Sequence, residues 1–128
     1  MVAPAAARSS EALRLAQQAW KLLHIDSARA ILLADQALAK ALARGDAAGE
    51  GWARLARGFH LIYFARPRIA APELRAAQQI FERLGDAPSR AGTLGTIADA
   101  LQARGALDEA LRIRREEQLP VYERLGDV

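Results

Sequence analysis

The stretch GALDEALR, residues 105–112, contains a helix stop followed at once by a helix start. Gly105 ends the preceding helix, because glycine enters the left-handed conformation at little cost. Asp108 and Glu109 then place negative charge in the first turn of the next helix, where it is stabilising. The run before the glycine, IADAL at residues 97–101, has apolar residues at helical spacing. Two weaker copies of this pattern occur upstream, so the sequence predicts an array of helix pairs.

The composition favours one all-α domain. The chain has 128 residues, about the size of a single domain, is rich in alanine and has few β-branched residues, a balance typical of helix. Cysteine is absent, so neither disulfides nor thiolate metal sites can form, and we expect a cytoplasmic protein. The longest apolar run is too short to cross a bilayer, so no membrane partner is expected. Residues 1–8 are predicted to form a disordered N-terminal segment.

Glycines and caps divide the rest of the chain into six expected helices. Gly45, Gly85 and Gly105 stop helices, while Asp26 and Asp46 are placed to accept hydrogen bonds from the free amides of the next helix. The expected helices cover residues 9–24, about 27–44, 46 to about 65, about 70–84, 86–104 and 107–125.

Prolines refine two of these boundaries. Pro67 is expected to end the third helix, and Pro72 is expected in the first turn of the fourth, where its missing amide costs little. Pro120 falls inside the sixth helix, where a proline removes one backbone hydrogen bond and clashes with the previous turn. The sequence therefore predicts a kink or break near Gln118.

The helix pairs repeat. The pentapeptide ERLGD occurs at residues 82–86 and again at 123–127, and Ala30, Ala70 and Ala110 occupy the same early position in each second helix. A period of this length predicts a right-handed α-helical solenoid of about three helix-turn-helix units. We expect one domain at 9–128 with repeats at about 9–45, 46–85 and 86–127. The predicted core residues are Trp20, Trp52, Leu55, Phe59, Leu94, Ile97, Leu101 and Ala110.

The pattern resembles the tetratricopeptide repeat (TPR) family, in a long-helix bacterial form. The match is best at residues 91–112, and Gln17, Arg114 and Glu117 depart from the small or apolar residues of the family pattern. The residues that carry the resemblance there are Leu94, Ile97, Ala98, Leu101, Gly105, Leu107 and Ala110. The resemblance implies a non-enzymatic scaffold for protein–protein interaction, in which the first helix of each pair lines a concave groove.

No constellation typical of catalysis, a cofactor or a metal occurs in the sequence. His24 and His60 lack acidic or histidine partners at ligand spacing. Glycine pairs at residues 49–51 and 92–95 lack the preceding strand of a phosphate-binding loop. We predict that these glycines let the first helices pack closely, and that the protein is not an enzyme and has no cofactor.

The predicted groove is basic. Arg54 and Arg57 lie three apart on one helix, and Arg14 and Lys21 lie seven apart on another, so each pair shares a helix face. Together they are expected to form one concave wall that binds an acidic protein or peptide segment. The full predicted groove consists of Arg14, Gln18, Lys21, Arg54, Arg57, Leu61 and Asp99.

Three further hypotheses stay open. The chain resembles regulatory or sensory TPR regions of larger bacterial signalling proteins that carry a cyclase, a kinase or a transcription regulator. The net charge is +3, but it is spread along the chain, so nucleic acid is expected only as a weak partner of the arginines. A homodimer through an end repeat is also predicted, because a terminal repeat without a polar outer face must be covered by a capping helix or a partner to stay soluble.

Overall fold

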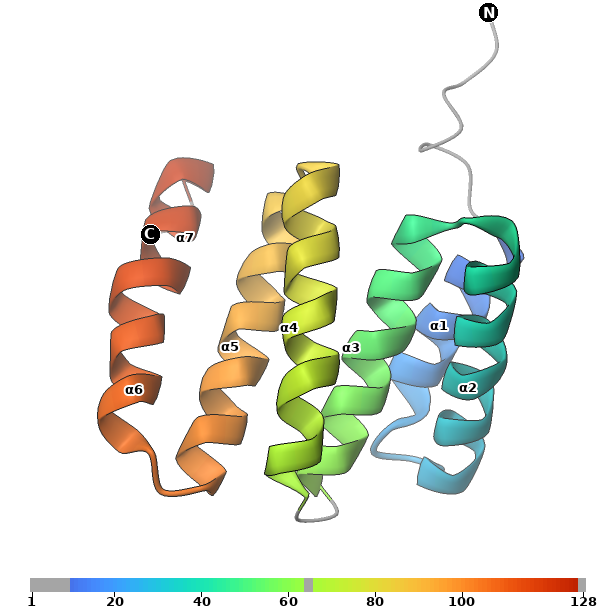
Figure 1. Ribbon diagram of the computed structural model, residues 1–128, viewed down its shortest axis with the longest axis horizontal. Helices are drawn as coiled ribbons and strands as arrows, with labels where there is room; N and C mark the ends of the chain where they lie inside the picture. The colour runs from blue at the N-terminus through green and yellow to red at the C-terminus, as the bar shows by residue number, and fades with distance from the viewer. Residues whose placement is uncertain (1–9, 64–65, 127–128) are drawn as a thin grey trace, which may run out of the picture.

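The computed structural model describes residues 10–63 and 66–126, and within these ranges it is all-helical, without strands (Figure 1). The predicted all-α class is confirmed for this part of the chain, whereas the predicted segment 1–8 lies outside it. The helices are α1 (Glu11–Leu22), α2 (Ser27–Arg44), α3 (Ala47–Tyr63), α4 (Pro67–Leu84), α5 (Ala87–Ala103), α6 (Leu107–Arg112), the π-helical η2 (Ile113–Gln118) and α7 (Leu119–Leu125).

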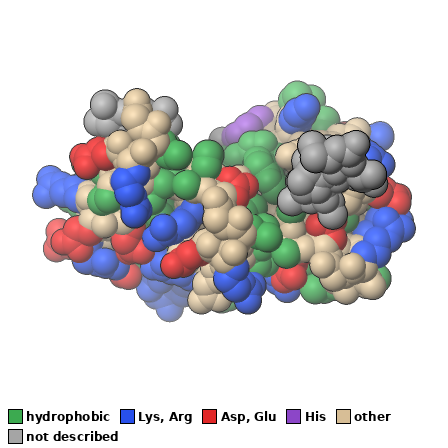
Figure 2. All heavy atoms as spheres, turned by 90° about the horizontal axis from the view of Figure 1, so that it is seen from above, with side chains coloured by type: hydrophobic (Ala, Val, Ile, Leu, Met, Phe, Trp, Pro, Cys, Tyr) green, Lys and Arg blue, Asp and Glu red, His purple; other side chains and the backbone are tan. Residues whose placement is uncertain are grey.

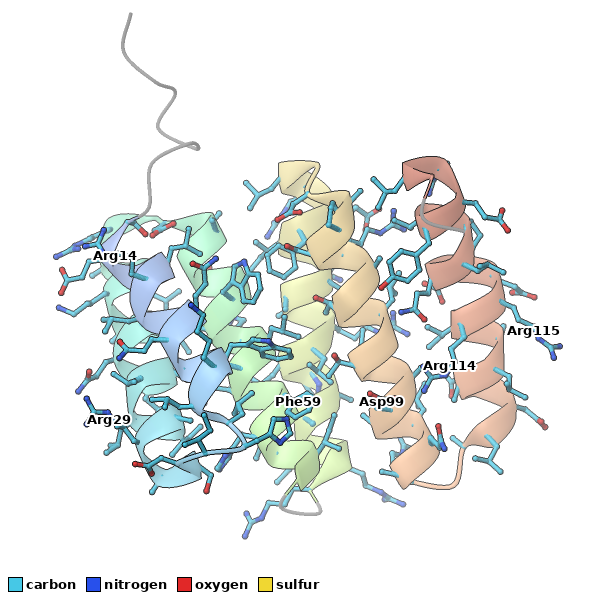
Figure 3. The ribbon with its side chains drawn as sticks, turned by 180° about the vertical axis from the view of Figure 1, so that it is seen from behind. Arg14, Arg29, Phe59, Asp99, Arg114 and Arg115 are labelled. Carbon is cyan, nitrogen blue, oxygen red and sulfur yellow. The ribbon has the colours of Figure 1, made fainter. Side chains whose placement is uncertain are left out.

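The helices α1 to α5 form two layers. One contains α2 and α4, the other contains α1 and α5, and α3 packs against both layers. Figure 1 shows α2 and α4 toward the viewer, with α1 and α5 behind them, and Figure 3 shows the same layers from the other side. We call these faces the α2/α4 side and the α1/α5 side. Because α3 contacts α1, α2, α4 and α5, its side chains contribute to the surface on both sides.

The helix ends confirm the local predictions. Gly45, Gly85 and Gly105 have φ angles of +63°, +69° and +84°, so each adopts the left-handed conformation that favours glycine. The carboxylates of Asp26 and Asp46 each accept a hydrogen bond from the amide three residues later, at 3.1 and 3.0 Å. These contacts depend only on neighbours in sequence, which explains why the sequence pattern predicted these helix ends correctly.

The prediction for the fourth helix was wrong by one turn. The helix begins at Pro67, and Pro72 lies inside it. Pro67 takes the first helical position, where the amide that proline lacks would have no partner within the helix. Pro72 is exposed.

The last helix changes its winding before Pro120 and continues without a break. Residues Ile113–Gln118 are π-helical, and α7 follows directly. Such wide turns are a recognised way of accommodating an irregularity within a helix. Here the Gln118 side chain lies against Gly95 of α5, and its Nε2 donates a hydrogen bond to the Ala91 carbonyl at 3.1 Å. Gln118, the last residue of this π-helical segment, therefore connects the last helix to α5 through a hydrogen bond.

The packing of α3 on α4 depends on two glycines. A Cβ atom at Gly51 would lie 2.9 Å from the Phe81 ring, and one at Gly58 would lie 2.5 Å from Leu74 Cδ2. The two glycines are seven residues apart, as are Leu74 and Phe81, and both large side chains are fully buried. Each glycine thus makes room for one large side chain, and the helices approach closely at both points.

The structure buries the aliphatic members of the predicted core and leaves its three aromatic members partly buried, with Trp20 and Trp52 packed against the core. The structure buries Leu55, Leu94, Ile97, Leu101 and Ala110. Trp20, Trp52 and Phe59, which were expected in the core, are only partly buried. Their helical spacing marks an apolar face correctly, but that face lies on the α1/α5 side, where α3 meets few residues of α5.

Candidate partner-binding site

Five rings form an edge-to-face series that runs from the buried Phe81 of α4 through the rings of α3 to Trp20 and His24. Ring centroids are 6.2 Å apart for Phe81 and Trp52, 6.1 Å for Trp52 and Trp20, 5.1 Å for Trp20 and Phe59, and 5.5 Å for Phe59 and His24. The interplanar angles lie between 68° and 84°. Such pairs contribute about 0.5–1.5 kcal/mol beyond area burial. These contacts therefore restrain the orientations of the partly exposed rings of Trp20, Trp52 and Phe59.

A hollow of about 270 Å³ opens beside these rings, between α3 and the start of α5. We call it the aromatic hollow. Figure 2 shows hydrophobic side chains gathered between the two ends of the molecule, where its outline is hollowed. The hollow is lined by Trp20, Trp52, Leu55, Pro88, Ser89 and Gly92.

Gly92 leaves the hollow open. A Cβ atom built on Gly92 meets no atom of the described residues within 4 Å. At Gly49, Gly51 and Gly95 the nearest atom would lie 2.6–2.9 Å away. The prediction that these glycines allow close packing is confirmed for those three and wrong for Gly92. The sequence carries no signal for this difference, because Ala91, Thr93 and Thr96, which surround Gly92 on the helix, are all buried.

The charged groups around the aromatic hollow include Asp86, whose carboxylate accepts a hydrogen bond from the amide of the lining residue Ser89 at 3.2 Å. Lys21 follows Trp20 directly in α1 and is exposed. Asp99 on α5 accepts a hydrogen bond from Arg114 Nη2 at 2.7 Å, and Figure 3 shows the two side chains facing each other. The same view places Arg14 at the outer edge of α1, away from α3.

The predicted wall of four cations is wrong. Arg54 and Arg57 lie on the α2/α4 side of α3, where they contact carboxylates of both neighbouring helices. Arg54 Nη1 is 3.3 Å from Glu73 Oε1, and Arg57 Nε is 3.3 Å from Asp35 Oδ1. Arg54 also bonds Glu50 at 2.8 Å, which helps raise its pKa. Arg14, Gln18 and Lys21 remain on α1, so the structure does not unite the two sets.

Leu61, the remaining groove residue from α3, lines a second hollow on the α2/α4 side. This hollow measures about 340 Å³ and is lined by Ile31, Asp35, Arg57, His60, Leu61 and Arg66. Burial lowers the pKa of His60, against a smaller opposing effect of the Asp35 charge. Asp35 and Arg57 neutralise each other across it, so this hollow offers a partner less unpaired charge than the sequence implied.

The ion pairs of Glu73 should stabilise the contact of α3 with α4. Replacing Glu73 by Gln is expected to lower the free energy of unfolding by about 1 kcal/mol, because two partly buried arginines lose a shared carboxylate. Urea unfolding measures the change, which should shrink in concentrated salt. Glu123→Gln, at an exposed position on α7, is the matched control. Equal effects of the two substitutions would contradict the assigned role of Glu73.

Residues 10–63 and 66–126 contain no group of three or more His, Asp or Glu side chains placed to hold a metal ion. In the same ranges no helix combines the length and apolar character needed to cross a membrane. Comparisons with protein-family models, with curated proteins and with solved structures gave no match for this chain.

Proposed function

We propose that this chain is a non-enzymatic protein-interaction module, a TPR-like right-handed solenoid that binds a partner segment along its α1/α5 side in the cytoplasm. The three units are α1 with α2, α3 with α4, and α5 with the α6–η2–α7 rod. Their boundaries lie close to the repeats expected from the sequence, and Gly45, Gly85 and Gly126 end the second helix of each unit with positive φ angles. This agreement supports the proposed repeats.

The observation that carries the proposal is the aromatic hollow. Two tryptophans and a phenylalanine stay partly exposed, while small alanines fill much of the core beneath them. Burying apolar surface stabilises a complex by roughly 25 cal/mol per Å², and aromatic residues dominate the energetics of most interfaces. Rigid rings on an open face are thus a surface from which a partner gains affinity.

Two other hypotheses concern the wider role of the chain and the class of its partner. A regulatory region of a larger bacterial signalling protein would use the same surface, so it is compatible with this proposal. Nucleic-acid binding is disfavoured, because Arg54, Arg57, Arg112 and Arg114 all lie within 4 Å of carboxylates. These ion pairs would have to be broken before phosphates could be bound.

The exposed residues of the last helix, α6–η2–α7, bear on the predicted homodimer. The last helix exposes Asp108, Arg112, Arg115 and Glu116, and Arg112 pairs with Glu117 at 3.3 Å. The same helix also exposes Leu107, Leu111, Leu119 and Leu125, each 38–56% exposed, so its outer face is partly apolar. A homodimer through this end therefore stays a prediction beside the partner segment on the α1/α5 side.

A displayed library of random peptides tests the proposed function. The library is selected on the wild-type protein, and each enriched peptide is measured against Gly92→Met and Gly92→Ala. Methionine should fill the hollow, whereas alanine leaves most of it open, and both residues favour helix more than glycine does. We expect peptides that bind wild type and Gly92→Ala but bind Gly92→Met at least about tenfold more weakly. Selection that yields no Gly92→Met-sensitive peptide would sink the proposal.

A further inference from the structure

A small hollow of about 150 Å³ lies where α5 packs between α4 and the start of α6 (Figure 1). We call it the arginine hollow, because Arg75 of α4 and Arg104 at the end of α5 both line it. The other lining residues are Ala71, Ile97, Ala100, Leu101 and Glu109. None of these residues lines the aromatic hollow, so this site is separate from the surface of the proposed function.

The charged residues that line the arginine hollow are two arginines and one glutamate. Within residues 10–63 and 66–126, Arg75, Arg104 and Glu109 take part in no ion pair. By contrast, Arg54 and Arg114 each contact a carboxylate. The lining therefore carries a net charge of +1, which a single monoanion would balance. Glu109 disfavours a dianion such as phosphate, because its second negative charge would stay unbalanced.

The hydrogen-bonding groups at the hollow also favour a carboxylate. A guanidinium group can only donate, and its planar fork matches the two oxygens of a carboxylate. The last turn of α5 brings backbone carbonyls to the same place, but two of them are already engaged. The amide of Arg104 donates to the Ala100 carbonyl at 3.2 Å, and the amide of Ala106 donates to the Leu101 carbonyl at 2.9 Å. These carbonyls therefore compete little for the arginine donors.

The volume of the hollow limits the ligand to a few atoms. A cavity of about 150 Å³ accommodates a molecule of benzene size, with about six non-hydrogen atoms. The arginine hollow has the same volume, about 150 Å³, and is smaller than the sites of roughly 300–1,000 Å³ that enclose a drug-sized ligand. It has room for a carboxylate with a short hydrocarbon chain.

The burial of the lining residues orients such a ligand. Ile97 and Leu101 are 2% and 7% exposed, whereas Arg104 and Glu109 are exposed. The charged groups therefore lie toward the mouth, and the buried side chains form the apolar floor. We infer that the arginine hollow binds a free short-chain monocarboxylate, such as propionate or butyrate, with its carboxylate at the two arginines and its chain on this floor. A glutamate side chain of a partner would have to enter with its carboxylate first, which does not match this orientation.

NMR titration of the isotope-labelled full chain tests this site. Propionate is the probe, and sodium chloride keeps the ionic strength constant. We expect resonances of the lining residues to shift with saturation at a Kd on the order of 1–10 mM, because exposed charge pairs each contribute little. Acetate lacks one CH₂ group and should bind about three- to fourfold more weakly. The uncharged propionamide should bind at least about tenfold more weakly, because it loses the charge-assisted hydrogen bonds.

Matched variants assign the binding to the two arginines. Arg75→Gln and Arg104→Gln should each weaken propionate about three- to tenfold, because each removes one guanidinium partner. Arg83→Gln makes the same charge change at an exposed position of α4 that does not line the hollow, and it should have little effect. Glu109→Gln should strengthen propionate binding and allow phosphate to bind, because it removes the opposing negative charge. Circular dichroism of each variant shows that it is folded.

Three results would overturn the inference. They are propionate shifts that do not saturate below about 100 mM, equal binding of propionamide, and equal effects of Arg75→Gln and Arg83→Gln. Tighter binding of phosphate than of propionate to the wild type would also reject it. Acetylated and amidated glutamate carries the same carboxylate on a peptide backbone, and a preference for it would reject a free acid as the ligand. The display library reads the aromatic hollow, so its result is independent of this one.

Discussion

Phe81→Ala is expected to lower the free energy of unfolding by about 3–5 kcal/mol. Phe81 is 1% exposed and is the largest of the fully buried side chains. Its ring fills the space over Gly51, which has no side chain to move into the gap, and it contacts Trp52 edge to face at 6.2 Å. The cavity would therefore relax little, which places the cost toward the upper end of this range.

Thermal and urea unfolding measure this effect. For a domain of this size, the expected loss corresponds to a fall in Tm of roughly 10–20 °C. Leu84→Ala on the same helix is the matched control, because Leu84 is 47% exposed, and its cost should stay below about 1 kcal/mol. If both variants melted together, the position of Phe81 in the core would be wrong.

Phe81→Ala should also disturb the aromatic hollow. Trp52 stands between Phe81 and Trp20 in the ring series, so losing one neighbour leaves its indole less restrained. The emission of the folded variant is therefore expected to differ from that of the wild type even before unfolding. This coupling joins the α3/α4 core to the face proposed for the partner.

Gly58→Val is the second large effect, at about 3 kcal/mol of destabilisation. A Cβ atom at Gly58 would lie 2.5 Å from Leu74 Cδ2 and 2.6 Å from its Cγ. Leu74 is fully buried, so it has no free space to move into. Valine adds two further methyl groups, and its better helix propensity recovers only a few tenths of a kcal/mol. Helices α3 and α4 would have to separate.

The same substitution at Gly92 provides the control. Gly92 is also inside a helix, but a Cβ atom there meets no described atom within 4 Å. Gly92→Val is expected to change the stability by no more than about 0.5 kcal/mol, in the stabilising direction. Equal destabilisation of the two variants in urea unfolding would show that helix propensity, and not the Leu74 contact, governs Gly58.

The candidate site was only partly accessible to sequence reasoning. The helical spacing predicts Trp20 and Trp52 as core residues and Lys21 as a residue of the basic groove, but the structure leaves both tryptophans partly exposed. Arg54 and Arg57 were correctly placed on one face of a helix, yet that face lies against Asp35 and Glu73 on the α2/α4 side. Helical spacing fixes the angle between side chains on one helix and leaves open which neighbour each will meet.

What the sequence by itself determined is the set of helices and most of their ends. A glycine with positive φ, such as Gly45 or Gly85, and a carboxylate three residues before a free amide act over a few positions. Only the tertiary structure decided which side chains are buried and which remain exposed on each side of the molecule. The Phe81 contact of Gly51 and the open space at Gly92 both depend on helices far away in sequence. The difference arises because backbone conformation is set by local sterics and hydrogen bonds, whereas burial depends on the packing of all helices together.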